Sequence, residues 1–141
     1  MIYRVATPED WPAVEECIAS TGYYFPVDAS TLGGIIVVAE RERDHKIVGC
    51  LWAMVGGRHA YLDYLSTHRE HHGVVALWLG VYMEKVLRNL GVRWVRSVVK
   101  TDNRPAQRIA EANGMVGDPG YSLYFKELHG STDLTEANRT K

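Results

Sequence analysis

The stretch of sequence that most constrains the fold is a strand, a polar loop, a long helix and a second strand in direct succession. Residues 59–66 alternate in polarity, which is typical of a β-strand and places Tyr61, Asp63 and Leu65 on one face. Residues 74–90 repeat apolar side chains at helical spacing, and Gly91 stands where a helix commonly ends. Residues 93–99 are rich in valine and predict another strand. Two strands joined by such a helix run parallel in one sheet, so the segment predicts a β-α-β unit.

The rest of the chain supplies the other elements of a single domain. Further strands are predicted at residues 2–5, 35–40, 47–55 and 121–128, a first helix from Thr7, Pro8 and Asp10 onward, and a last helix at residues 106–112. This order predicts an α/β (α+β) domain with a central mixed, mostly antiparallel sheet of about six to seven strands and helices on both faces. The domain is expected to span residues 1–128, and the polar residues 129–141 are expected to be a disordered tail.

Composition and charge exclude several classes of protein. With 141 residues, 46% of them apolar, the chain can bury a core without disulfides or metals. A net charge of −1 argues against a nucleic-acid partner. No apolar run reaches the roughly 18 residues that a membrane span needs, so no membrane association is expected. Cys17 and Cys50 are too few for a disulfide framework, and they predict buried free thiols in the cytoplasm.

The chemistry is expected at the turn between the strand and the long helix. The first N–H groups of a helix lack intrahelical partners, and the helix dipole adds partial positive charge, so this turn suits a pyrophosphate. Gly73 and Ala76 are small enough to let a phosphate approach the backbone. Three histidines, His68, His71 and His72, lie in this loop, and His71 or His72 either helps to neutralise phosphate or is a solvated loop residue. They lack the spacing and partners of a metal site, so no metal is expected.

Residues 71–76, with the sequence HHGVVA, are similar to the R/Q-x-x-G-x-G/A signature of the GNAT acetyltransferases. Ala76 fits the last position of that signature, and His71 takes the place of its basic or amide first residue. Val74 stands where the middle glycine is expected, so the motif is degenerate at this position.

The resemblance to the GNAT family extends over residues 2–128. Residues 4–10, RVATPED, are similar to the usual opening of these proteins. Asn103 follows the strand after the long helix, and a short helix ends at Gly114, with the spacing of the family.

This resemblance implies the GNAT fold, in which two splayed parallel strands form the cleft for acyl-CoA and acetyl-CoA is the acyl donor. It implies that the pantetheine arm pairs with the backbone of the first of those strands. The residues that would contact the coenzyme by position are Tyr64, Leu65, Ser66, His71, His72, Gly73, Val74, Val75, Ala76 and Asn103.

Acetyl transfer needs a base for the amine and a proton donor for the leaving thiolate. Asp63 is the candidate base, because burial on its strand face is expected to raise its pKa; it could equally be a hydrogen-bonded structural carboxylate. The tyrosine that often protonates the thiolate in the family is replaced by Ala110. Tyr121, Tyr124 and Ser66 are the candidate substitutes, although the two tyrosines could also be plain sheet-packing residues.

The sequence leaves the acceptor open. Tyr23, Tyr24 and Phe25 either line a substrate site or plug the edge of the core. The function implied by the resemblance is an N-acyltransferase that acetylates a primary amine of a small molecule or a protein. The alternative is a non-catalytic GNAT-fold binding or structural protein, and a homodimer is compatible with either.

Overall fold

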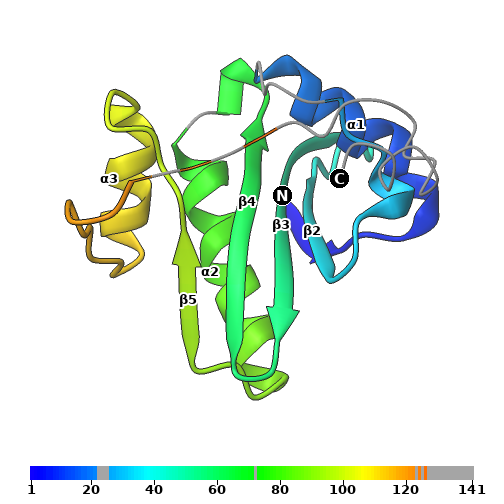
Figure 1. The fold of residues 1–141 in the computed structure, drawn as a ribbon. Coiled ribbons are helices and arrows are strands. Elements are labelled where there is room, and N and C mark those ends of the chain that lie inside the picture. Colours follow the sequence, from blue (N-terminus) through cyan, green and yellow to red (C-terminus); the bar gives the residue numbers. More distant parts are fainter. Residues whose placement is uncertain (22–25, 72, 123, 125, 127–141) are drawn as a thin grey trace, which may run out of the picture.

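Five strands, hydrogen-bonded in the order β1-β2-β3-β4-β5, form the sheet of this computed structural model, which describes residues 1–21, 26–71, 73–122, 124 and 126 (Figure 1). The antiparallel strands are β1 (Ile2–Val5), β2 (Ile35–Glu40), β3 (Ile47–Gly56) and β4 (His59–Thr67). The fifth strand, β5 (Trp94–Ser97), pairs parallel with β4. The predicted mixed, mostly antiparallel sheet is therefore confirmed.

Two helices cover opposite faces of the sheet. The long helix α2 (Val74–Asn89) is the crossover between β4 and β5, and in Figure 1 it lies behind the sheet. Helix α1 (Trp11–Ser20) packs on the other face, and α3 (Arg104–Ala112) lies beside α2. Short 3-10 segments cover Pro8–Asp10, Ala29–Thr31 and Arg69–His71. Over the part of the chain that the structure describes, no helix has the length and apolarity to cross a membrane.

The predicted count of six to seven strands is too high for the described residues. Of the strand expected at residues 121–128, the described members Tyr121, Ser122, Tyr124 and Lys126 are not in a strand. A sequence pattern indicates only that a segment could be extended. A strand also has to pair with the edge of a sheet, and the pattern does not show whether it does. The remaining residues of that segment, and the tail expected at residues 129–141, lie outside the described residues.

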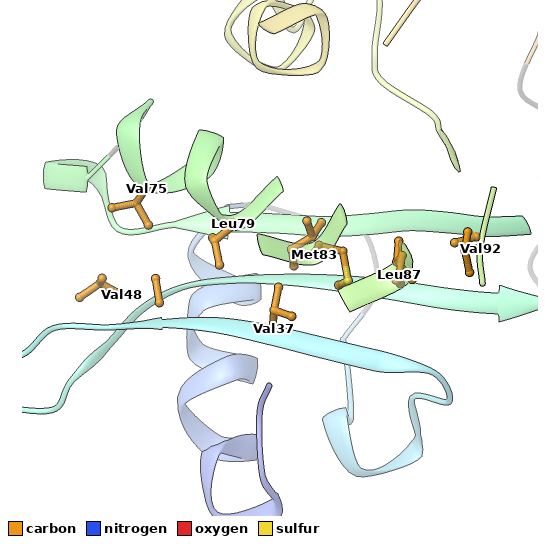
Figure 2. Close-up of a cluster of buried hydrophobic side chains, with 11 residues drawn as sticks. Val37, Val48, Val75, Leu79, Met83, Leu87 and Val92 are labelled. Carbon is orange, nitrogen blue, oxygen red and sulfur yellow. The ribbon is translucent and has the colours of Figure 1, made fainter. Parts of the chain in front are cut away.

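The larger core lies between α2 and the sheet (Figure 2). A Cβ at Gly49 of β3 would lie 3.0 Å from Leu79 Cδ1 and 3.1 Å from Val75 Cγ1, so the glycine lets α2 pack directly on the strand. The fully or almost fully buried members are Val37, Ala39, Val48, Leu51, Ala53, Ala60, Val75, Leu79, Met83, Leu87 and Val92.

The second core lies between α1 and the opposite face of the sheet. Val14, Cys17 and Ile18 of α1 point inward, as their helical spacing predicts. They pack on side chains of β2 and β3, including Ile36 and Cys50. Both thiols are free and buried, as predicted, and burial raises the pKa of Cys17 to about 11 and that of Cys50 further still. Neither thiol is therefore a nucleophile at neutral pH.

The start of α1 is tied to the first strand by an ion pair. The Arg4 guanidinium donates to both oxygens of Asp10, at 2.7 and 2.9 Å, and also to Glu40 at 3.2 Å. The Thr7 N–H donates to Asp10 Oδ2 at 2.7 Å, and the Asp10 N–H donates to the Thr7 carbonyl at 2.9 Å. The residues that open the family-like segment therefore fix the angle at which the chain enters α1.

Candidate functional site

The parallel strands β4 and β5 pair only over part of their length. Their ladder runs from His59, opposite Trp94, to Leu62, opposite Ser97, while β4 continues to Thr67. At the last rung the Ser97 hydroxyl donates to the Leu62 carbonyl at 2.9 Å. Beyond it the chain turns away from β4 toward α3 (Figure 1). This divergence agrees with the splayed parallel pair that the sequence predicts.

A β-bulge in β4 begins where the two strands diverge. Cys50 pairs with Ser66 and Trp52 with Asp63, so Tyr64 and Leu65 together lie opposite a single residue of β3. Tyr64 has a φ of 54°, in the left-handed region that is unusual for a residue with a side chain. Its N–H donates to Asp63 Oδ1 at 2.7 Å, and its carbonyl accepts from the Ser66 hydroxyl at 3.2 Å. The side chains before and after Tyr64 thus hold the bulge.

The bulge corrects the prediction that Tyr61, Asp63 and Leu65 share one face of the strand. Leu65 packs on the α2 core, whereas Tyr64 packs on the α1 core and stacks on Trp52, with ring centroids 5.6 Å apart. One inserted residue reverses the alternation, and nothing in a period-2 pattern marks where such an insertion falls.

The half-buried side chains around the bulge have shifted pKa values. Burial raises the pKa of the Asp63 carboxyl, as predicted, and its bond from the Tyr64 N–H offsets part of that rise. Burial also raises the pKa of the Tyr61 phenol; Asp63 adds to the rise and Arg96 opposes it. The pKa of Tyr64 is raised by burial and by Asp63. Both phenols therefore keep their protons at neutral pH.

The N-terminus of α2 has no side-chain cap among the described residues. Its N-cap, Gly73, has a φ of 90° and supplies no side-chain cap, and nothing lies within 4 Å of a Cβ placed there. Among the buried side-chain polar atoms of the described residues, His71 Nε2 lacks a hydrogen-bond partner. Glu70 Oε1 lies 4.0 Å from that nitrogen. Val74, the first residue of α2, is 68% exposed.

The other candidate residues are placed as follows. Ser66 is buried, and its hydroxyl lies 3.3 Å from that of Thr21, at the end of α1. Asn103 caps α3 by accepting from the Ala106 N–H at 3.2 Å. Tyr121 and Tyr124 are 82% and 91% exposed and lie in no strand, so the described structure does not bring them to Asp63.

Several predicted site residues lie outside the described residues, and two others are buried in the core. Tyr23, Tyr24, Phe25 and His72 lie outside the described residues. Val75 and Ala76 are buried, so their side chains pack in the domain and only their backbone faces the turn. Within the described ranges, no three histidine, cysteine, aspartate or glutamate side chains gather as a metal site would require.

Three residues near Asp63 were missed by the sequence reasoning. Trp52 and Tyr61 lie on the same sheet face as Asp63, and Arg96 of β5 lies opposite Tyr61. Strand alternation already placed Tyr61 on that face. The position of Arg96 depends on the register between β4 and β5, which no sequence signal sets.

The fold is shared with solved acetyltransferases, whereas the sequence alone matches no family model and no curated protein. An aminoglycoside 6′-N-acetyltransferase from Acinetobacter haemolyticus superposes with a TM-score of 0.69 at 14% identity, over 92% of this chain and 100% of its own. Glucosamine-6-phosphate N-acetyltransferase from Arabidopsis thaliana gives 0.68 at 13% identity, over 92% and 98%.

A Mycobacterium tuberculosis protein solved in complex with CoA gives a TM-score of 0.64 at 17% identity, over 77% of this chain and 69% of its own. The chain therefore has the fold of the GNAT acetyltransferases, as the sequence predicts.

Proposed function

We propose that this protein is an N-acyltransferase that transfers an acetyl group from acetyl-CoA to a primary amine. The observation that carries the proposal is the divergence of β4 and β5 beyond Leu62 and Ser97, together with the side-chain-uncapped N-terminus of α2, the helix that follows β4. A diverging strand pair offers backbone groups to an extended ligand, and a helix N-terminus offers N–H donors to its phosphates. The acetyltransferases and the CoA complex that share this fold support the same assignment.

The residues at the start of α2 fit a pyrophosphate. Gly73 leaves room for an anion to reach the first-turn N–H groups, and the macrodipole of α2 favours negative charge there. His71 Nε2 is unpartnered but buried, so it would donate to a phosphate oxygen only after the ring turns toward the start of α2 with a proton on that nitrogen. When bound there, acetyl-CoA supplies an activated acetyl group.

The residues of the bulge supply the proton chemistry. The Asp63 carboxylate accepts a proton from the attacking amine, directly or through a water molecule, and its raised pKa makes it a stronger base than an exposed aspartate. Tyr61 and Tyr64 keep their phenol protons and are the nearby candidates to protonate the leaving thiolate. They take the place of Tyr121 and Tyr124 in the mechanism, because those two side chains project into solvent.

The test has a binding arm and a turnover arm. Thermal shift with CoA measures binding, since a ligand at 100 times its Kd stabilises by about 2.7 kcal/mol. Thiol release from acetyl-CoA against a panel of amines measures turnover. We expect both signals, and we expect Gly73→Val to reduce the thermal shift because it fills the space before the first N–H groups and strains a φ of 90°. The matched control is Gly57→Val, at another positive φ in the β3–β4 turn.

The same experiment separates the catalytic protein from a non-catalytic one. Ala110 at the position of the family's usual proton donor favours the non-catalytic alternative. Binding of CoA without thiol release for any amine would support a GNAT-fold binding protein. Absence of a thermal shift at millimolar CoA would rule out coenzyme binding altogether.

A further inference from the structure

The sheet face opposite α2 carries a group of aromatic side chains around one carboxylate and one guanidinium. The group consists of Trp52, Tyr61, Tyr64 and Trp94, which we call the aromatic platform, together with Asp63 and Arg96. Strand pairing sets their neighbours: Trp52 is opposite Asp63, Tyr61 is opposite Arg96, and Trp94 is opposite His59. Residues opposite one another in a ladder point to the same face, so these side chains share one surface.

This surface is partly exposed along the paired part of β4 and β5. Ala60 and Leu62 of β4 pack into the core beneath α2, so that helix closes the other face. On the platform side Trp94 is 65% exposed, and Met54, opposite Tyr61, is 52% exposed. A ligand that lies along the paired part of β4 and β5 on this face would therefore contact the platform.

The two charges lie on either side of Tyr61. Asp63 is two residues along β4, and Arg96 is directly across on β5; both influence the pKa of Tyr61, in opposite directions. No ion pair of the described residues joins Arg96 to Asp63 or to any other carboxylate. From strand geometry their Cα atoms are about 8 Å apart on the diagonal, a span that one small zwitterion can bridge with a hydrogen bond at each end.

We propose that this surface binds the acceptor and that the acceptor is an aromatic α-amino acid. Its ammonium group lies at Asp63, its carboxylate at Arg96, and its ring on Tyr61 and Trp94. The inference rests on the acetyl-transfer function proposed above and names the substrate class of that site. Aromatic stacking and a guanidinium–carboxylate pair would each add selectivity that Asp63 alone cannot give, because every primary amine offers it an ammonium group.

Matched pairs of amines test the proposal. Thiol release from acetyl-CoA is measured with phenylalanine against phenethylamine, tryptophan against tryptamine, and alanine against ethylamine. We expect kcat/KM for the aromatic amino acids to exceed that for their decarboxylated partners by about tenfold or more, the loss expected for removing a charge-assisted bond. Alanine should be poorer than phenylalanine because it lacks the ring.

Variants of Arg96 assign the preference to this side chain. Arg96→Ala should lower kcat/KM for phenylalanine about tenfold more than kcat/KM for phenethylamine, and Arg96→Lys should restore part of that difference. The control is Arg108→Ala, an exposed arginine on α3 away from the platform. Equal kcat/KM within each matched pair, or equal behaviour of Arg96→Ala and Arg108→Ala, overturns the inference.

A binding measurement keeps this inference separate from the proposed function. Phenylalanine and phenethylamine are titrated calorimetrically into the CoA-saturated protein. We expect Arg96→Ala to raise the Kd of phenylalanine and not that of phenethylamine. Turnover of amines without preference for a carboxylate removes this inference and leaves acetyl transfer intact. If CoA does not bind, the proposed function is wrong. Phenylalanine is then titrated into the protein without CoA, and absence of binding there would overturn this inference as well.

Discussion

On the α2 face of the sheet, Ala60 and Leu62 of β4 lie in an apolar core against α2, whereas on the opposite face Tyr61 and Asp63 are polar and partly exposed. Both sets belong to the same strand and alternate along it. The closed face is held by packing, and the open face carries the titratable groups with shifted pKa values. Because adjacent residues of this strand serve separate faces, substitutions at neighbouring positions should affect either stability or chemistry, but not both.

The largest expected effect is a loss of stability on the closed face. Leu79 is fully buried between α2 and β3, and Leu79→Ala should lower the free energy of unfolding by about 2–5 kcal/mol through lost burial and a residual cavity. Urea unfolding followed by circular dichroism measures it. The variant that remains folded should keep its affinity for CoA. If Leu79→Ala lowers the free energy of unfolding by less than about 1 kcal/mol, the α2 face is not the stabilising one.

A large effect on activity, without a loss of stability, is expected on the open face. Asp63→Asn keeps an oxygen that can accept from the Tyr64 N–H but removes the base, so kcat/KM should fall about 100-fold. The wild-type rate should rise with pH through the raised pKa of Asp63, and the variant should lack that limb of the profile.

The stability of Asp63→Asn should not fall along with its activity. Burial penalises the ionised form of Asp63, so its folded pKa lies above the unfolded one and the wild-type protein loses stability as pH rises between the two. Asp63→Asn should therefore be as stable as wild type at pH 3 and equal or more stable at pH 7. Thermal melts at the two pH values measure the difference, and a marked loss at pH 7 would assign Asp63 a structural role instead.

A smaller effect is expected where the first strand joins α1, the helix that covers part of the open face. The pairing with Arg4 lowers the pKa of Asp10, so its contribution is present above the unfolded pKa and lost as pH falls through the folded one. Asp10→Asn should cost about 1–2 kcal/mol at pH 7, and the difference from wild type should shrink below about pH 4. Melting curves across pH 2–7 test this.

The smallest expected effect lies at the coenzyme end of β4. His71→Ala should weaken CoA binding only a few-fold, because the imidazole adds to donors that the helix backbone already supplies. Titration of CoA into the two proteins measures the difference, and an affinity equal to that of the wild-type protein would remove His71 from the site.

The sequence by itself determined the scaffold. The period of residues 74–90 and the flanking strands predicted the parallel β4–β5 pair, because parallel strands need a crossover of this length, usually a helix. The capping residues at Thr7 and Asp10, the buried thiols and the direction of the Asp63 pKa shift were also readable, since each depends on near neighbours in the chain or on a simple alternation.

Only the tertiary structure decided how the candidate site is assembled. The bulge at Tyr64, the end of the ladder at Ser97 and the placement of Arg96 beside Tyr61 all depend on register between strands. Register is set by the packing of whole faces rather than by any one residue, so the alternation that predicted a shared face for Asp63 and Leu65 was wrong at the residue where the strand departs from it. The sequence of residues 71–76 predicted a phosphate site at this turn. The absence of a side-chain cap at the N-terminus of α2 and the unpartnered nitrogen of His71, among the described residues, were found only in the structure.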